Sequence, residues 1–414
     1  MTSELLYKIS SCSKDLRVRD ESLDFKGIPA SEGVNAIHSY PAMFHPRLVR
    51  RYLNIYSEKG ENVLDPFMGS GVSAVEASVS ERRFFGFDLN PLAVLIAQVR
   101  TTPITKKILE KNLDYLLSQY NKINPLKPDF KNINFWFSQE RIISLSKLIA
   151  AIESVKNEQA RKLFKVSFSE TVRAVSWTRP NEFKLFRRKQ PCLIPTLSIF
   201  KTIVKKNMET LLRYYSQHQI KYPPILQIKN ILKDELPIDD KSISLLITSP
   251  PYGDSQTTVA YGQFSRLPLQ WMGLPYQIDK ESLGAKPIPI QKDIPSSHLY
   301  EALNLIKAKD KKRAMQVYSF YHDLFHAMQK VIPKIKSGGH LIWVVGNRTV
   351  KGIQLPTDLI CNDLLEALGC QHLETRIRQI DNKRMPSENS PTNIPGKTAP
   401  TMKYEYIVVY KKIV

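Results

Sequence analysis

The chain has 414 residues, in which 60 Lys and Arg outnumber 39 Asp and Glu and give a formal net charge of +21. This length exceeds one typical core, so we expect two domains, and the charge favours a phosphate-rich partner such as a nucleic acid. Four cysteines at isolated positions argue against a disulfide framework or a zinc site, and no apolar run is long enough to span a membrane. We therefore expect a cytoplasmic protein that binds no metal and has no membrane partner.

A strand, a glycine turn and a helix are predicted in succession near residue 65. Residues 62–64 are an apolar strand that leads into Asp65-Pro66-Phe67-Met68-Gly69-Ser70-Gly71, and small residues suited to a helix follow from Val72. Gly69 and Gly71 lack a Cβ, so the backbone could approach a ligand closely. Roughly twenty residues after the first strand, a second strand ends at Asp88, whose carboxylate could hold both hydroxyls of a ribose. The pattern predicts nucleoside binding and differs from the dinucleotide motif G-x-G-x-x-G.

Helical periodicity dominates the middle of the chain. Four segments have the apolar spacing of helices: 109–120, 138–155, 160–175 and 199–217. Residues 101–230 hold 24 Lys or Arg and 9 Asp or Glu, so most of the excess positive charge lies here. We interpret residues 101–224 as an inserted, mainly helical domain.

Aromatic and basic residues alternate within residues 176–189 of this insertion. Five cations are candidates for phosphate and base contacts: Arg179, Lys184, Arg187, Arg188 and Lys189. The alternative is a loop between helices whose aromatic side chains are core and whose cations are solvated. The sequence favours neither interpretation.

Strand patterns return after residue 225. The expected strands are 225–228, 244–247, 339–345 and 404–410, and the expected helices between them are 317–331 and 356–368. This alternation predicts an α/β fold with a doubly wound, mostly parallel sheet. The last strand is expected to pair antiparallel at the end of the sheet, as it does in the family that the motifs described below resemble.

The strand at 244–247 runs into Thr248-Ser249-Pro250-Pro251-Tyr252. Two prolines make a stiff turn, which would leave the Ser249 hydroxyl, the Ser249 and Pro250 carbonyls and the Tyr252 ring at the carboxyl end of the strand. Open α/β sheets bind ligands at that end. Acceptors for an amino group beside an aromatic face suit chemistry on the exocyclic amine of a base taken out of its stack.

Together these motifs resemble the S-adenosylmethionine-dependent amino-methyltransferases of DNA. The S-P-P-Y form resembles the cytosine-N4 enzymes of restriction-modification systems in particular. Residues 65–71 match the family's D-P-F-x-G-S-G cofactor loop, and Asp88 followed by Asn90-Pro91 matches its ribose-binding acid. Residues 38–46 resemble the segment that packs over the methionine end of the cofactor.

The resemblance implies a Rossmann-like catalytic domain with an inserted target-recognition domain, S-adenosylmethionine as cofactor and double-stranded DNA as substrate. Residues 1–100 would carry the cofactor-binding half and residues 225–414 the catalytic half. The implied catalytic residues are Ser249, Pro250, Pro251 and Tyr252. The implied cofactor-binding residues are Phe44, His45, Asp65, Pro66, Phe67, Gly69, Ser70, Gly71, Asp88 and Asn90.

Three positions depart from the family pattern. Val72 replaces the threonine that usually follows the glycine loop, and Ser244 replaces an aspartate inside the catalytic strand. Asn230 stands nearest to the acid that meets the adenine amino group of the cofactor, and its carbonyl could accept the same bond. Contacts to the cofactor beyond the loop therefore stay open.

The expected reaction is a direct methyl transfer to cytosine N4, in which neutral acceptors draw the exocyclic amine towards tetrahedral geometry. Adenine N6 is the nearest alternative, because it is also an exocyclic amine. An RNA base methyltransferase and a non-catalytic DNA-binding protein are further alternatives. The resemblance suggests, without requiring, a separately encoded restriction endonuclease. Two loops, residues 253–263 and 382–386, are candidates to face the DNA.

Overall fold

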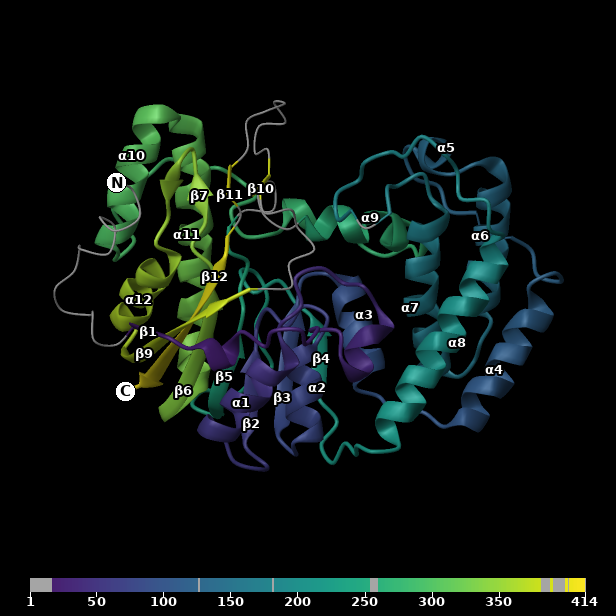
Figure 1. Ribbon diagram of the computed structural model, residues 1–414, viewed down its shortest axis with the longest axis horizontal. Helices are drawn as coiled ribbons and strands as arrows, with labels where there is room; N and C mark the ends of the chain where they lie inside the picture. Colours follow the sequence, from purple (N-terminus) through teal and green to yellow (C-terminus); the bar gives the residue numbers. More distant parts are fainter. Residues whose placement is uncertain are drawn as a thin grey trace.

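The computed structural model describes residues 17–125, 127–180, 182–253, 260–380, 388–389, 399–400 and 402–413. A central sheet with helices on its faces forms one lobe, on the left of Figure 1, and a block of helices forms the other. Helix α9 (Tyr261–Trp271) runs between the two lobes.

The central sheet has eight strands in the order β1-β9-β12-β6-β5-β2-β3-β4. Their bounds are β1 (Arg17–Arg19), β2 (Asn62–Asp65), β3 (Arg83–Asp88), β4 (Ile225–Ile228), β5 (Ile243–Thr248), β6 (Ile335–Val345), β9 (Cys370–Gln379) and β12 (Tyr404–Lys412). The five adjacent strands β4, β3, β2, β5 and β6 are parallel to one another. All six residues of β5 are buried, which explains why four of them are apolar and why the other two are the small residues Ser244 and Thr248. The predicted doubly wound, mostly parallel sheet is confirmed.

Strand β12 is antiparallel, as predicted, but it lies between β6 and β9 and not at the end of the sheet. Strands β9 and β1 lie beyond it and were not predicted. The sequence of β9 alternates charged residues, Glu374, Arg376 and Arg378, with few apolar ones. It lacks the apolar run that marks β5, because several of its side chains are only partly buried.

Helices α1 (Pro46–Tyr56), α2 (Val72–Val79), α3 (Pro91–Arg100), α10 (Ser297–Lys309), α11 (Lys311–Val331) and α12 (Thr357–Ala367) belong to the lobe of the sheet. The helical block contains α4 (Lys106–Gln119), α5 (Ile133–Trp136), α6 (Gln139–Glu153), α7 (Glu158–Val175) and α8 (Thr196–Tyr215). The four helices predicted in this block are confirmed, with ends displaced by up to three residues. Two small antiparallel pairs lie outside the central sheet: β7 (Thr349–Val350) with β8 (Ile353–Gln354), and β10 (Glu388–Asn389) with β11 (Ala399–Pro400).

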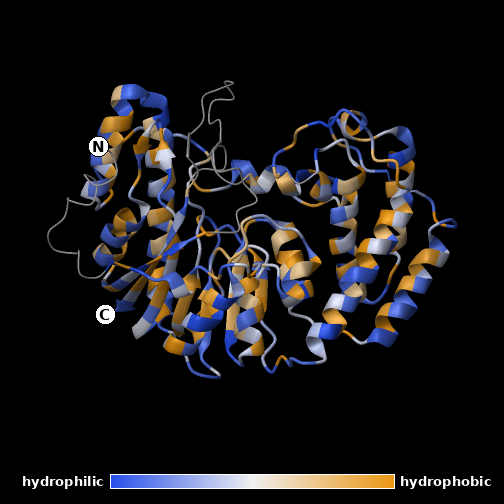
Figure 2. Cartoon of the chain, in the orientation of Figure 1, coloured by the Kyte–Doolittle hydropathy of each residue, from blue (hydrophilic) through white to orange (hydrophobic). Residues whose placement is uncertain are grey.

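The helical block shares a hydrophobic core with the sheet lobe. One cluster of buried side chains includes Ile96 of α3, Phe168 of α7 and Trp271 of α9. Trp271 packs edge-on against Phe137 and Phe168, with ring centroids 5.4 and 6.5 Å apart. The helices of the block carry both hydrophobic and hydrophilic residues, as expected of helices packed on one side (Figure 2). This continuous core fixes the position of α9 and of the helical block relative to the sheet lobe.

Within the described part of the chain, no helix is long and apolar enough to cross a membrane.

Candidate active site

A cavity opens at the carboxyl ends of β2, β3 and β5, where parallel sheets bind ligands. Both predicted motifs line it. The first contributes Asp65, Pro66, Phe67, Gly69, Ser70, Asp88 and Asn90, and the second contributes Ser249 and Pro251, with Gly253 directly after it. Further lining residues include Tyr40, Phe44, Asn230, Tyr261 and Glu281. The fold thus brings together two segments that are almost 180 residues apart in the chain.

The two glycines of the loop have different surroundings. Gly69 has φ +53°, and a Cβ added there would meet nothing closer than 4.0 Å, at the ring of Tyr40. Gly71 has φ +82°, and a Cβ there would lie 2.4 Å from the Cβ of Ala97 on α3. Gly69 lines the cavity and Gly71 does not. Gly71 therefore serves the close packing of α2 on α3, which corrects the expectation that both glycines face a ligand.

Asp88 closes the glycine loop from the end of β3. Its Oδ2 accepts the amide N–H of Gly69 at 2.9 Å, and its Oδ1 accepts that of Asn90 at 2.8 Å. Burial raises the pKa of this carboxyl to about 6 despite the two backbone donors. Each oxygen keeps further acceptor capacity on the side of the cavity.

The side chain of Asp65 connects the two motifs. Its Oδ1 accepts hydrogen bonds from the Thr248 hydroxyl, at 2.7 Å, and from the Phe67 amide, at 3.1 Å. Its Oδ2 accepts the Ser73 hydroxyl at 2.6 Å. Burial raises the pKa of Asp65 to about 6. The carboxylate therefore ties the end of β5 to the glycine loop, a link that neither motif reveals by itself.

Arg100 is a buried cation that the sequence interpretation missed. From the last turn of α3, its Nη1 donates to the carbonyl and hydroxyl oxygens of Ser70 at 2.9 and 2.8 Å. Its Nη2 donates to the carbonyls of Asn35 and His38. Burial lowers the pKa of this guanidinium to about 9. Arg100 thus holds the glycine loop against the segment that precedes α1.

The predicted residues of the segment before α1 have different positions. Phe44 lines the cavity, whereas the ring of His45 stacks on Phe25 at 4.3 Å between centroids and bonds to the Ile28 carbonyl at 3.2 Å. His45 does not line the cavity. Of the two residues considered for the methionine end of the cofactor, the geometry favours Phe44.

Asn90 lines the cavity but its side chain is already engaged. Its Oδ1 caps α3 by accepting the Leu92 amide at 3.1 Å, and its Nδ2 donates to Tyr40 and Ser265 at 3.0 and 2.7 Å. Asn90 therefore shapes the cavity by fixing Tyr40. The ring of Tyr40 lies 5.9 Å from that of Tyr261 at an angle of 23°, so two aromatic residues border this side.

Asn230 also borders the cavity. Its carbonyl accepts the Leu232 amide at 3.0 Å, and its amide group faces Glu281 at 3.4 Å. The carbonyl retains one lone pair, and Glu281 adds a carboxylate to the same wall.

The S-P-P-Y turn ends in a hydrogen-bonded group of side chains. The Ser249 hydroxyl lies 3.1 Å from the Tyr252 hydroxyl and 3.2 Å from the Val344 carbonyl. The Tyr252 hydroxyl donates to Glu405 of β12 at 3.1 Å. Ser249 and Pro251 line the cavity, whereas Pro250 and Tyr252 do not: Pro250 is buried, and the ring of Tyr252 packs partly buried against the hydrophobic core.

Comparisons with known proteins agree with this geometry. The family model described as DNA methylase, of the N6/N4 type, matches residues 4–99. The type II methyltransferase M.MvaI of Kocuria varians is 36% identical over 446 residues, which cover 99% of this chain and 97% of that protein. The chain belongs to the type II DNA methyltransferases of the N4/N6 family.

Other known proteins show weaker similarity to the methyltransferase. M.BsoBI of Geobacillus stearothermophilus is 22% identical over 69% of this chain and 58% of its own length. The crystal structure of an S-adenosylmethionine-dependent methyltransferase from Methanosarcina mazei covers 87% of this chain and 97% of its own, at 9% identity and a TM-score of 0.31. The predicted cofactor, S-adenosylmethionine, and the DNA substrate are confirmed by the family.

The basic segment of the methyltransferase forms a short hairpin. Thr178 and Arg187 form an antiparallel bridge, and the Leu185 amide donates to Gln263 of α9 at 3.2 Å. The hairpin therefore lies beside the helix that borders the cavity. Lys184 and Lys189 are exposed on it.

The arginines of the hairpin make contacts within the protein. Arg187 lies over the rings of Trp177 and Phe135, at 4.6 and 4.9 Å, and donates to the Phe135 carbonyl. Arg188 donates to the carbonyls of Ala174 and Ser176, and Arg179 is exposed with its guanidinium over Phe186. Arg187 and Arg188 thus anchor the hairpin to α5 and to the end of α7. DNA binding stays a prediction for all five cations.

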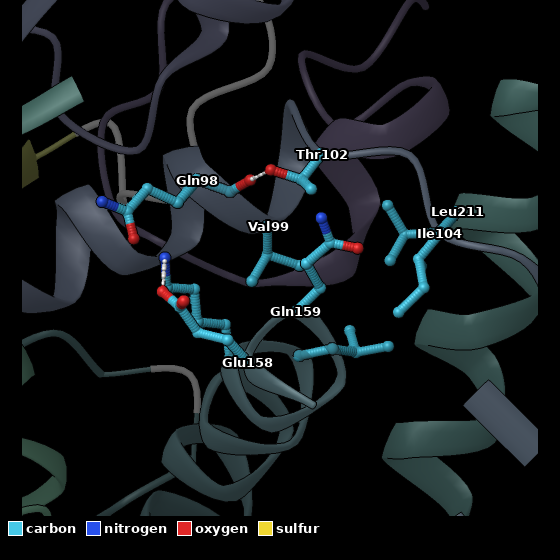
Figure 3. A pocket seen from close by; sticks show the side chains of 9 residues that line it. Gln98, Val99, Thr102, Ile104, Glu158, Gln159 and Leu211 are labelled. Atoms are coloured by element: carbon cyan, nitrogen blue, oxygen red, sulfur yellow. Dashed lines mark hydrogen bonds and ion pairs between the residues drawn. The ribbon is translucent and has the colours of Figure 1, made fainter. Parts of the chain in front are cut away.

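A second cavity of the methyltransferase lies at the joint of α3 with α7 and α8 (Figure 3). Its lining includes Gln98, Thr102, Glu158, Lys162 and Leu211. Lys162 pairs with Glu158 at 2.7 Å, and the Thr102 hydroxyl donates to the Gln98 carbonyl at 2.7 Å. No residue of either motif lines this cavity, which lies at the opposite end of α3 from Asn90.

Most of the two loops predicted to face the DNA, residues 254–259 and 382–386, lies outside the described residues.

Proposed function

We propose that the methyltransferase methylates the N4 amine of a cytosine rotated out of duplex DNA. The observation that carries this proposal is the cavity shared by the two motifs, which Ser249, Gly69 and Asp88 all line. A cofactor and a flipped base can meet only where both motifs open into one space.

The residues around the glycine loop fit a nucleoside cofactor. Asp88 offers two carboxylate oxygens for vicinal hydroxyls, and Gly69 leaves open space where a side chain would stand. Phe44 and the Tyr40–Tyr261 pair supply apolar walls. S-adenosylmethionine, when bound, supplies a methyl group activated by its sulfonium.

The S-P-P-Y turn supplies the groups that the target amine requires. The Ser249 hydroxyl, which lines the cavity, is a neutral acceptor on a rigid turn and would accept an N–H bond of an exocyclic amine. The lone pair of the nitrogen is then directed at the methyl group, and rate comes from positioning and fixed dipoles. Support for cytosine over adenine is the serine at the first position of the motif, because the S-P-P-Y form resembles the cytosine-N4 enzymes.

DNA is proposed to approach across α9, with residues 101–224 as the target-recognition domain. Lys184 and Lys189 are exposed on the hairpin that contacts α9 through Gln263. Their charges would bind phosphates beside the cavity.

The test is transfer of labelled methyl from S-adenosylmethionine to unmethylated genomic DNA, followed by nucleoside mass spectrometry of the digest. The expected product is N4-methylcytosine. N6-methyladenine would overturn the assignment of the base while leaving the amine chemistry in place. Tyr252→Ala should bind the cofactor normally and lose turnover, whereas equal loss of both would contradict the role of the turn.

We also propose a cognate, separately encoded restriction endonuclease, in keeping with the type II name of M.MvaI. DNA methylated by this enzyme should resist cleavage by an extract of the source cells that cuts the unmethylated DNA. Equal cleavage of both samples would contradict the proposal.

A further inference from the structure

Three side chains and one carbonyl form a continuous chain of contacts behind the proposed target site. The Ser249 hydroxyl contacts both the Val344 carbonyl and the Tyr252 hydroxyl, and the Tyr252 hydroxyl contacts Oε1 of Glu405. Glu405 lies 153 residues from Tyr252 in sequence and belongs to neither motif.

The number of hydroxyl protons among these contacts determines which group donates in each hydrogen bond. Two hydroxyl protons serve three contacts, and an ionised carboxylate can only accept. Burial raises the pKa of Tyr252 well above its ordinary value, so the tyrosine keeps its proton and donates it to Glu405. Ser249 must then donate, either to Tyr252 or to Val344. In both cases the Ser249 oxygen accepts no hydrogen bond from Tyr252 or Val344. Its lone pairs therefore stay available to a donor on the substrate.

Arg378 fixes the orientation of Glu405. The two residues are direct cross-strand partners on β9 and β12, and Nε and Nη2 of Arg378 both donate to Oε2 of Glu405, at 2.8 and 2.5 Å. This leaves Oε1 to Tyr252. The third nitrogen, Nη1, donates to the Leu23 carbonyl at 3.4 Å. Both side chains of the ion pair are largely buried, at 8% and 13% exposed, so the carboxylate is held in one position.

We propose that Glu405, held by Arg378, is a positioning residue that turns the Tyr252 hydroxyl away from Ser249 and so keeps the Ser249 oxygen an acceptor for the target amine. The assignment rests on the proposed function of Ser249. If Tyr252 instead donated to Ser249, that oxygen would lose a lone pair to the tyrosine and would compete less well for the amine N–H.

Glu405→Gln should reverse the donor direction of the hydrogen bonds that run from Tyr252 while hardly changing the shape of the side chain. The glutamine carbonyl should turn to the charged Arg378, which places its NH₂ group against Tyr252 and makes Tyr252 donate to Ser249. We expect kcat to fall by about 10- to 100-fold, less than the loss of about 10²- to 10³-fold that follows outright removal of a hydrogen bond to the transition state, while the Kd values for cofactor and DNA change by less than about twofold.

Tyr252→Phe separates this mechanism from a merely structural role. It removes the misdirected proton, so it should cost kcat only a few-fold, and the double variant Glu405→Gln/Tyr252→Phe should recover to the rate of Tyr252→Phe alone. A double variant as slow as Glu405→Gln, or slower, would overturn the proposal. Single-turnover methyl transfer to unmethylated genomic DNA by the full chain is the measurement.

Two further variants complete the design. Glu374→Gln removes another ion pair of β9, with Arg376, which has no contact with Tyr252, and should leave the rate unchanged. Glu405→Asp keeps the charge beside Arg378 but withdraws the oxygen from Tyr252, so it must also be slow and be rescued by Tyr252→Phe. If thermal unfolding shows that Glu405→Gln does not fold, Glu405→Asp replaces it in this experiment.

Product analysis separates this proposal from the proposed function. N6-methyladenine with the expected rescue would overturn the choice of base and retain the role of Glu405. N4-methylcytosine without rescue would overturn the role of Glu405 alone.

Discussion

Cofactor affinity should depend on pH through Asp88. Burial raises the pKa of this carboxyl from its ordinary value of 3.8 to about 6. The ionised form offers acceptors to the two ribose hydroxyls, and the protonated form replaces one acceptor by a donor. Affinity for S-adenosylmethionine should therefore be full at neutral pH and fall as the pH falls through 6.

The size of the effect follows from that pKa. If only the ionised form binds, the Kd rises by the factor by which ionised Asp88 is depleted, about 11-fold at pH 5 and about 1.1-fold at pH 7 for a pKa of about 6. The free energy of unfolding of the cofactor-free protein should change with pH in the opposite direction. A raised pKa in the folded state means that the contribution of Asp88 to stability is fully present below pH 3.8 and is lost as the pH rises through 6, by about 3 kcal/mol at most.

Isothermal titration of S-adenosylmethionine between pH 5 and 8 measures this dependence. Asp88→Asn should bind more weakly and without the pH dependence. Glu281→Gln is the matched control, because Glu281 lines the same cavity but the hydrogen bond from Lys233 lowers its pKa, so the profile should stay that of the parent. A Kd that stays constant from pH 7 to 5 would refute the reasoning. If Asp88→Asn kept the pH dependence, the titrating group would instead be Asp65, whose pKa is also about 6.

Two further predictions concern packing and DNA. Gly71→Ala should lower the free energy of unfolding by about 2–4 kcal/mol, since its Cβ would meet that of Ala97 at 2.4 Å and φ is +82°. Gly338→Ala, at φ +77° with open space, should cost about 1 kcal/mol in the same denaturant titration, and equal losses would contradict the packing argument. Lys184→Ala/Lys189→Ala should weaken DNA binding and reduce the slope of log K against log salt by about 2, and an unchanged slope would place the DNA elsewhere.

The contacts within the hairpin limit what charge reversal there can test. Arg187 and Arg188 donate to backbone carbonyls, so their substitution would disturb the hairpin as well as its charge. Lys184 and Lys189 are exposed, which makes them the cleaner positions for measuring a phosphate contact.

The elements predicted well are those whose signal is local. Strand β5 is buried along its whole length and reads as an apolar run, and the helices of the block have apolar residues at helical spacing. Strand β9 was missed because charged residues that pair with neighbouring strands interrupt its apolar pattern. Missing it also misplaced β12, which takes its position from β9 on one side and β6 on the other.

By itself, the sequence determined the two motifs, their order and the chemistry they favour, because a glycine loop, an acid after a strand and a proline turn are encoded in adjacent residues. Only the tertiary structure decided what each of these residues contacts. It assigned Gly69 to the cavity and Gly71 to packing, engaged the side chain of Asp65 with Thr248, and brought Glu405 to Tyr252. Such contacts join positions up to 183 residues apart, and their geometry depends on the order and register of the strands, which no local pattern specifies.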